Sequence, residues 1–429
     1  MKKKLLSIVL SVFMTLSVFA GCATPPTADM CPEHNIPLTV GYGIGNQTYL
    51  FGMCYILEER GYPGNPNFDF ETEVRLLANM GVRSIRNWMH IRRGEQGMLL
   101  APEVVNRQAA DVMHDRVNTF KEHGIQVIGM SHTSFHSGTF LSGKPARDLT
   151  PGSYYLGWLY DYYLSWRTLV EEFPQIEIWQ ICNEMNNPHF MRDLFNNPVY
   201  TLNDMANIAT DMLFYASKGI LESNPAALTV IGAPTETAGL GAGPTRQFFN
   251  LVYDNIFSGS FGWYDAEGTV TASTDTDDYF MAAAWHPYMH TERFDADQFV
   301  YRNNEIYQII LNRAGKHKRV FFTEMGFNHN RWSEQEVARS ITEMFEAIQD
   351  RMPYVEALHY FKIFNQAQVA WTGTISRYGL FYDPDFNRND FCPVNATVRR
   401  TPGAPTLGAL AFQEAAGGSG SLDLIKWHV

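Results

Sequence analysis

The sequence contains little cysteine and no excess of basic charge. Five cysteines occur among 429 residues, and their intervals do not match the spacing of a metal site. Asp and Glu number 45 against 33 Lys and Arg, which gives a formal net charge of -12. This balance argues against nucleic acid as a partner. Beyond residue 22 no apolar run reaches the ~18 residues that a membrane-spanning helix needs. No glycine-rich nucleotide fingerprint follows a strand-like run.

The N-terminal segment is typical of a targeting signal and not of a folded domain. Residues 2–4 are all lysine, residues 5–19 are mainly apolar, and small residues directly precede Cys22. This order resembles the processing site of a bacterial lipoprotein, so we predict a signal peptide over residues 1–21 and lipidation of Cys22. Residues 22–36 are then a tether that anchors an exported protein to the membrane, at the bacterial cell surface or in the periplasm. An ordinary secretory signal and an uncleaved anchor are the alternatives.

Three other cysteines bear on the fold. Cys182 lies inside an apolar, strand-like run, where we expect a small buried side chain. Whether Cys31 and Cys54 pair in an exported protein stays open, because sequence alone does not decide connectivity.

Apolar, strand-like runs alternate with amphipathic helical patterns along most of the chain. In one such unit a helix carries Val74 and Leu77 on one face, Gly81 ends it, and a strand-like run over residues 82–86 follows. When a first strand at residues 38–42 is counted, the pattern gives eight strand–helix units.

The number of units indicates how the sheet closes. Strands that alternate with helices indicate a parallel sheet, and eight of them in one chain favour a closed barrel. We therefore predict the α/β class, with a single (β/α)8 TIM barrel over residues 37–416 and a C-terminal tail over residues 417–429. The glycine-rich residues 417–420 predict a flexible hinge. An open, doubly wound sheet is the alternative, and the missing nucleotide fingerprint counts against it.

Three insertions lengthen the repeat, at residues 133–151, 186–201 and 258–278. We expect each of them to connect a strand to the helix that follows it. In an α/β barrel these connections form the ligand-binding face.

Two apolar runs, residues 178–184 and 319–326, carry the carboxylates of Glu184 and Glu324 at or near their ends. A buried strand that finishes on a charge is costly unless the charge serves a site. Because the C-terminal ends of parallel barrel strands meet on one face, we expect the two carboxylates to approach each other. Glycosidic-bond cleavage with retention needs two carboxyl groups ~5–5.5 Å apart, one a protonated acid and the other an ionised nucleophile.

The motifs around these residues resemble those of glycoside hydrolase clan A, the (β/α)8 retaining glycosidases, and most nearly family 5. In that clan an Asn-Glu pair ends strand four, and Asn183-Glu184 matches it. The resemblance implies that Glu184 is the acid/base and that Asn183 holds the sugar 2-hydroxyl. A Thr-Glu-x-Gly sequence often ends strand seven, and residues 323–326 match it, which implies that Glu324 is the nucleophile.

Further positions extend the resemblance over roughly residues 38–415. It implies that Arg86, near the end of strand two, supports the nucleophile, and that His132 ends strand three at the site. The sequence His286-Pro-Tyr288 matches the His-x-Tyr of strand six. Tyr288 is then expected to donate its hydroxyl to the nucleophile.

Two positions depart from the usual pattern of family 5. Met185 stands where the sequence Asn-Glu-Pro is usual, and strand eight lacks the tryptophan that lies under the sugar. We expect Phe361, Phe364 or Trp371 to take the place of that tryptophan. Family 39 and other clan A families are therefore alternatives.

Aromatic side chains stack on the apolar faces of sugars, and the sequence has nine tryptophans. Four fall in predicted rim loops and are candidates for substrate contacts: Trp88, Trp263, Trp332 and Trp371. Another four fall in predicted helices and strands, where we expect core packing: Trp158, Trp166, Trp179 and Trp285.

We expect no metal and no other cofactor. His286 and His290 are separated by a spacing that can hold a metal on a helix. Pro287 argues against a helix at this place, and no third ligand is evident.

These expectations point to a retaining hydrolase of β-glycosidic bonds. Export of such an enzyme points to an extracellular polysaccharide as its partner, so we expect an endo-acting β-glycanase of the cellulase, mannanase or β-glucanase type. We expect it to act as a monomer. An exo-acting β-glycosidase of the same clan and a non-catalytic surface glycan-binding barrel are the alternatives. The sequence identifies neither the sugar nor its linkage.

Overall fold

A computed structural model defines the fold of the chain. It describes residues 47, 49–55, 69–89, 91, 100–131, 144–191, 200–236, 244–289, 291, 293–365, 378–382, 391–392, 395–399 and 403–424. All of these residues belong to one compact unit, Gly43–Val429.

Several sequence predictions concern residues outside these ranges. They are the signal peptide and tether, together with Cys22, Cys31, His132, His290 and Trp371. These stay predictions.

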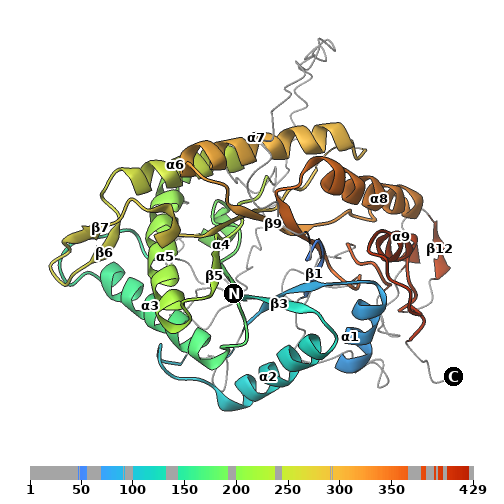
Figure 1. Ribbon diagram of the computed structural model, residues 1–429, viewed down its shortest axis with the longest axis horizontal. Coiled ribbons are helices and arrows are strands. Elements are labelled where there is room, and N and C mark those ends of the chain that lie inside the picture. The colour runs from blue at the N-terminus through green and yellow to red at the C-terminus, as the bar shows by residue number, and fades with distance from the viewer. Residues whose placement is uncertain are drawn as a thin grey trace, which may run out of the picture. The chain divides into compact units, whose positions relative to one another are not determined.

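Eight parallel strands close into a barrel, which confirms the predicted (β/α)8 fold (Figure 1). Around the barrel the order is β1-β10-β9-β8-β5-β4-β3-β2. The bounds are β1 Phe51–Tyr55, β2 Ser84–Trp88, β3 Gln126–Ser131, β4 Ile178–Ile181, β5 Leu228–Val230, β8 Ala282–Trp285, β9 Arg319–Met325 and β10 Val355–Phe361. Because β10 pairs in parallel with β1 and closes the sheet, the C-terminal ends of all eight strands lie on one face.

Helices surround the barrel in Figure 1. The longer ones are α1 Phe70–Asn79, α2 Arg107–Glu122, α3 Tyr154–Glu172, α5 Leu202–Ser223, α6 Thr245–Phe257, α7 Ala296–Ala314, α8 Glu334–Arg351 and α9 Leu407–Ala415. The short helix α4, Pro188–Met191, follows β4. Outside the barrel lie the hairpins β6 Gly262–Tyr264 with β7 Val270–Ala272 and β11 Phe391–Cys392 with β12 Asn395–Arg399, and the 3-10 helix η2 Thr276–Asp278.

Local sequence signals define where several helices begin and end. Thr201 and Ser333 form capping boxes with Asp204 of α5 and Glu336 of α8. Helix α7 ends at Gly315, whose φ of 65° is a left-handed conformation that glycine adopts without strain. With these ends fixed, the apolar face of each helix can pack against the barrel.

The tryptophans expected in the core lie there. Trp166 and Trp179 pack edge to face, with ring centroids 6.0 Å apart, between α3 and the barrel wall. Trp158 and Trp285 are also buried. Large aromatic side chains therefore fill the layer between the barrel and its helices.

Two of the cysteines are buried free thiols, Cys54 and Cys182. The burial of Cys182 agrees with its expected place in the core.

The prediction for the first barrel strand was wrong. The sequence pattern placed it at residues 38–42, whereas the strand that pairs with β2 and β10 is β1, Phe51–Tyr55. This short run contains Gly52, a residue that β-propensity disfavours. The packing explains the glycine, because a Cβ at this position would lie 2.6 Å from the ring of His359. Close packing inside the barrel, and not local propensity, selects the residue.

The insertion at residues 258–278 does not lie on the predicted side. It follows α6 and precedes β8, so it is a helix-to-strand connection and belongs to the face opposite the ligand-binding one. It contains the β6–β7 hairpin at the edge of the unit (Figure 1). Trp263 of this hairpin stacks on Tyr215 of α5 with ring centroids 4.8 Å apart. The prediction that Trp263 contacts substrate is therefore wrong.

The glycine-rich segment after α9 is not the flexible hinge that its composition predicts. Asn79 Nδ2 donates to the carbonyl of Ser421 at 2.7 Å, and Gln413 Nε2 donates to the carbonyl of Gly420 at 2.7 Å. A Cβ on Gly418 would lie 2.5 Å from the carbonyl oxygen of Asn79. These glycines permit close contact with the end of α1.

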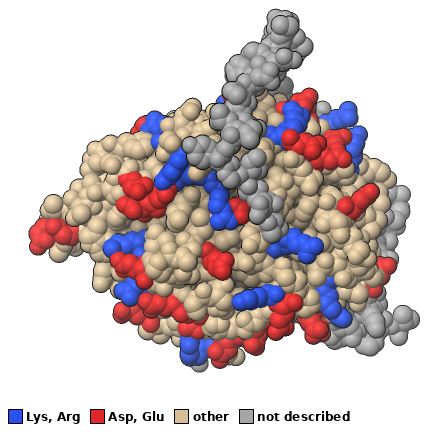
Figure 2. Space-filling model, viewed as in Figure 1, with Lys and Arg blue, Asp and Glu red and all other residues tan. Residues whose placement is uncertain are grey.

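The surface gives two further facts. Among the residues that the structure describes, no helix combines the length and the apolar character needed to cross a bilayer. On the face shown in Figure 2, basic side chains are interspersed with acidic ones and no broad basic area is visible. Such an area is typical of nucleic-acid binding.

Two glycine substitutions test how tightly the barrel is packed. Gly129→Ala in β3 is expected to destabilise the protein by ~1–3 kcal/mol, because the new Cβ would lie 2.5 Å from the Trp179 ring. Gly157→Ala in α3 meets no atom within 4 Å and is expected to be neutral or stabilising by up to ~1 kcal/mol. Thermal unfolding midpoints measure both, and equal midpoints for the two variants would contradict this account.

Candidate active site

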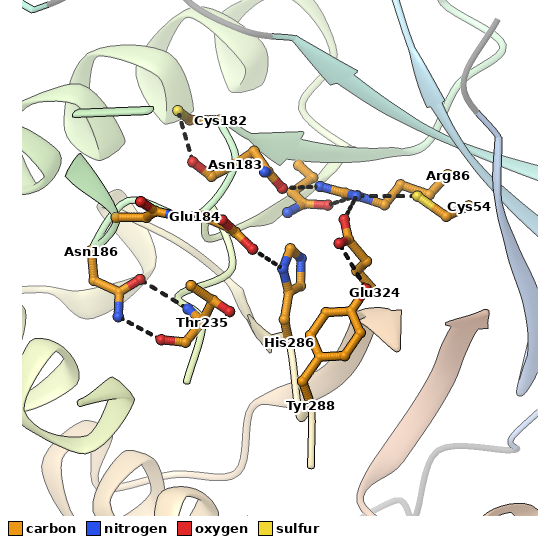
Figure 3. Close-up of polar contacts among 12 residues, drawn as sticks. Cys54, Arg86, Cys182, Asn183, Glu184, Asn186, Thr235, His286, Tyr288 and Glu324 are labelled. Carbon is orange, nitrogen blue, oxygen red and sulfur yellow. Dashed lines mark hydrogen bonds and ion pairs between the residues drawn. The ribbon is translucent and has the colours of Figure 1, made fainter. Parts of the chain in front are cut away.

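The two carboxylates predicted from the sequence lie close together at the C-terminal face of the barrel. Glu184 follows β4, and Glu324 is the penultimate residue of β9. One oxygen from each carboxylate and one ring nitrogen of His286 all lie within 4.8 Å of one another. Two segments far apart in the chain thus place their acidic groups around a common space (Figure 3).

Glu324 is held by one cationic and one neutral donor. Arg86 Nη1 lies 3.3 Å from Oε2, and the hydroxyl of Tyr288 donates to Oε1 at 2.9 Å. Burial raises the pKa of Tyr288 well above its usual value, and the nearby Glu324 charge adds to that rise. Tyr288 therefore stays protonated and donates. The two donors hold one oxygen each and so orient the Glu324 carboxylate.

Arg86 itself is fixed from several strands, and its side chain is only 1% exposed. Its Nε donates to Gln180 Oε1 at 2.7 Å and its Nη1 to Cys54 Sγ at 3.3 Å. Its Nη2 contacts Met130 Sδ and Asn183 Oδ1. A planar guanidinium with acceptors on several sides has little freedom to turn away from Glu324.

The supporting residues Gln180, Cys54 and Met130 were not predicted from the sequence. Gln180 did give a signal, because it is a lone polar residue inside the apolar run of β4. Cys54 was missed because β1 was placed elsewhere. Burial raises the pKa of its thiol to about 11, so Cys54 is neutral and does not compete for the charge of Arg86.

Glu184 has a different environment from Glu324. Nδ1 of His286 lies 3.0 Å from Oε1, and Asn187 Nδ2 donates to Oε2 at 2.6 Å. Burial lowers the pKa of His286 to about 3, although the Glu324 charge opposes that shift. His286 is therefore a neutral partner near pH 7. These two contacts of Glu184 are with uncharged groups, whereas one contact of Glu324 is with the cation Arg86.

The backbone around Glu184 is unusual. Glu184 has a φ of 40° and Cys182 a φ of 69°, both in the left-handed region that non-glycine residues rarely adopt. Such conformations cost of order 1–3 kcal/mol each and cluster at functional sites. They turn the chain sharply after β4 and present Glu184 toward His286 (Figure 3).

Asn183 directly precedes Glu184 in the chain and contacts Arg86, which in turn contacts Glu324. Its Oδ1 accepts from Arg86, which fixes the orientation of the amide. The NH₂ group of the amide is then the one that can donate to a substrate oxygen.

The aromatic residues at the rim only partly follow the predictions. Trp88 ends β2 and Trp332 lies between β9 and α8, but each is only 6% exposed. Phe364 is buried too. Phe361, at the end of β10, is half-buried and packs edge to face with Tyr378 at 5.6 Å between centroids.

Tyr378 also packs against Tyr288, with ring centroids 6.3 Å apart. It lies in the connection after β10 and was not predicted as a site residue. Of the described aromatics near the strand-eight position, Phe361 and Tyr378 are the ones that remain partly exposed.

The donor set does not fit a metal ion. Glu184, His286 and Glu324 offer ligand atoms within 4.8 Å of one another. The guanidinium of Arg86 already lies against one oxygen of Glu324, and Tyr288 donates to the other. A second cation would face repulsion from Arg86 at this short distance.

Acid titration of His359 should weaken the barrel beneath the site. His359 is buried in β10 beside Ser84, and burial together with the charge of Arg86 lowers its pKa to about 3. In the unfolded chain the same histidine has a pKa of ~6.5. Between that pH and about 3 the unfolded state binds a proton that the folded state does not, so the free energy of unfolding falls as the pH drops. The slope for one such group is ~1.4 kcal/mol per pH unit.

The variant His359→Gln removes this titration. Urea unfolding of both proteins between about pH 7 and about pH 5 should show the variant less stable at the higher pH and the difference shrinking toward the lower. A difference that stays constant with pH would contradict the buried neutral state of His359.

Comparisons with known proteins support the fold. A scan against models of protein families and a search of curated proteins find no match. Among solved structures, a family 39 glycoside hydrolase from Bacteroides cellulosilyticus WH2 shares 16% identity with a TM-score of 0.54, over 86% of this chain and 64% of its own. This chain therefore spans less than two thirds of that enzyme.

Two other solved structures give similar values. A glucosidase from Croceicoccus marinus shares 14% identity with a TM-score of 0.56, over 88% of this chain and 69% of its own. A GH5-4 broad specificity endoglucanase from Clostridium acetobutylicum shares 12% identity with a TM-score of 0.52, over 87% and 98%. At these identities the likeness shows the fold: this chain has the (β/α)8 barrel that these glycoside hydrolases have.

Proposed function

We propose that this protein is a retaining glycoside hydrolase that cleaves β-glycosidic bonds. The observation that carries the proposal is the close approach of Glu184 and Glu324, whose nearer oxygens lie within 4.8 Å. Retaining glycosidases hold their carboxyl groups ~5–5.5 Å apart, whereas inverting ones leave ~6.5–9.5 Å for a water molecule. The shorter spacing fits direct attack by one carboxylate.

In the first step Glu324 attacks the anomeric carbon and forms a covalent glycosyl-enzyme. Arg86 and Tyr288 suit this role, because each contacts one oxygen of the carboxylate and together they orient it for attack. Glu184 protonates the oxygen of the departing sugar. The NH₂ group of Asn183 is positioned to donate to the sugar 2-hydroxyl, a contact that strengthens in the transition state.

In the second step a water molecule releases the sugar. Glu184, now ionised, removes a proton from the water as it attacks the anomeric carbon. The contacts of Glu184 with the neutral ring of His286 and the amide of Asn187 suit a group that gives up a proton in one step and takes one in the next.

We further propose that the substrate is a β-linked polysaccharide cleaved internally. The name of the Clostridium acetobutylicum relative describes an endoglucanase, and the shared barrel covers 98% of it. Phe361 and Tyr378 offer partly exposed rings beside the site. An exo-acting β-glycosidase is the other outcome, and chromatography of products from a polysaccharide panel separates the two: a ladder of oligosaccharides indicates endo action, and a single small product indicates exo action.

The N-terminal sequence supports a location for this activity. A signal over residues 1–21 and lipidation at Cys22 are proposed to hold a monomeric enzyme at the cell surface or in the periplasm. That location gives access to extracellular glycan.

Removal of the nucleophile is the first test of the proposal. Glu324→Ala is expected to lower kcat by several orders of magnitude with little change in the unfolding midpoint, because the covalent step loses its attacking group. Turnover is measured on the most responsive glycan of the panel. Glu343→Ala on the outer helix α8 serves as the control, and near-normal turnover by Glu324→Ala would overturn the assignment.

Removal of the acid/base tests the second carboxylate. Glu184→Ala is expected to lose ~10²–10⁴-fold in kcat/KM on substrates with poor leaving groups. The loss should be far smaller on activated aryl glycosides, whose leaving groups need no proton. Equal losses on both substrate types would count against Glu184 as the acid.

A further inference from the structure

The acid side of the site contains contacts that the sequence motifs do not account for. Asn187 Nδ2 donates to Glu184 Oε2 at 2.6 Å, and its backbone N–H donates to the carbonyl of Glu184 at 2.8 Å. Asn187 is fully buried. One residue therefore contacts both the carboxylate and the backbone of Glu184.

Asn186 joins the same turn to the segment after β5. Its Nδ2 donates to the carbonyl of Thr235 and its Oδ1 accepts from the N–H of Thr235, each at 2.9 Å (Figure 3). Asn186 is also fully buried. Two hydrogen bonds from one rigid amide fix both the distance and the angle between the two segments.

The segment after β5 in turn positions His286. Thr235 forms a parallel bridge with His286, whose N–H donates to the carbonyl of Pro234 at 2.9 Å. Since His286 Nδ1 lies against Glu184, the contacts return to the residue where they began. We name Asn186, Asn187, Thr235 and His286 the acid-side network.

We propose that Asn186 and Asn187 are positioning residues for Glu184, a role that rests on the proposed acid/base function. Asn187 aims the carboxylate, and Asn186 keeps the turn after β4 in register with His286. The left-handed backbone at Glu184 and Cys182 requires such support, because non-glycine residues hold this conformation only where their surroundings determine it.

The groups that face Glu184 determine the balance between its protonated and its ionised form. Among the described residues they include the neutral ring of His286, the carboxylate of Glu324, which lies within the same 4.8 Å group of atoms, and Arg86, which contacts Glu324 and Asn183. The Glu324 charge favours the protonated form of Glu184, and the donor on Asn187 favours the ionised form. An acid that must later act as a base needs both influences.

Asn187→Leu tests the role by removing the donor at nearly constant volume. On aryl glycosides with poor leaving groups kcat/KM is expected to fall by up to ~10²-fold, and on activated ones to change little. The basic limb of the pH profile of kcat/KM is expected to move to higher pH by about one unit, since the ionised carboxylate loses a hydrogen bond.

Asn187→Asp and Asn186→Asp extend the test with near-isosteric changes. Asn187→Asp should move the basic limb to higher pH by at least as much as Asn187→Leu does, because a like charge disfavours ionisation of Glu184. Asn186→Asp keeps the oxygen that accepts from the N–H of Thr235 but loses the NH₂ group that donates to the carbonyl of Thr235. It should therefore lower kcat/KM more on poor leaving groups than on activated ones, as Asn187→Leu does. Asn250→Leu on α6 is the matched control, expected to alter neither readout.

Glu184→Ala in the same assay distinguishes a failure of the acid/base function of Glu184 from a failure of the positioning role of Asn186 and Asn187. If Glu184→Ala shows no leaving-group dependence, the acid/base function itself fails. If Glu184→Ala shows the dependence but the asparagine variants lose activity equally on both substrate types with an unmoved basic limb, only the positioning role is refuted.

Discussion

The contact between Arg86 and Glu324 is the interaction on which the rest of the site depends. A guanidinium that is 1% exposed is costly to bury unless it is paired and its other donors are satisfied. Gln180, Cys54 and Asn183 accept from it, and these acceptors come from β1, β4 and the turn after β4. The barrel must therefore close in the correct register before Arg86 can meet Glu324, which makes the fold and the charge arrangement mutually dependent.

The two carboxylates show how one barrel gives two acids different chemistry. Glu324 faces a fixed cation and the hydroxyl of Tyr288. Glu184 instead contacts the ring of His286, which is neutral because burial lowers its pKa to about 3, and the side-chain amide of Asn187. Pairs of titratable groups whose environments differ in this way are typical of acid/base catalysis. The short distance between them then links the proposed mechanism to retention.

The sequence predicted most of the architecture, because hydrophobic periodicity repeats along the chain and the barrel follows from counting units. Strand ends pointed to Glu184 and Glu324, and the resemblance to clan A motifs pointed to Arg86, His286 and Tyr288. The structure brings these five side chains close together. The first barrel strand was missed because Gly52 is selected by contact with His359, a constraint that local pattern does not contain.

Other features depend on contacts between distant segments and leave little trace in sequence. Asn186 pairs with Thr235 and Asn187 with Glu184, yet two adjacent asparagines in a loop suggest only a turn. The side of the barrel on which Trp263 lies depends on the order of α6 and β8. That error came from assigning the insertion to a strand-to-helix connection instead of a helix-to-strand connection.

The stereochemistry of cleavage tests the central claim most directly, because the spacing of Glu184 and Glu324 predicts it. Proton NMR of the anomeric signals, recorded during the first minutes of hydrolysis of a responsive β-linked substrate, identifies the configuration of the initial product. The account predicts that the β-anomer forms first and then mutarotates to the equilibrium mixture. Initial formation of the α-anomer would contradict a covalent intermediate on Glu324 and with it the proposed mechanism.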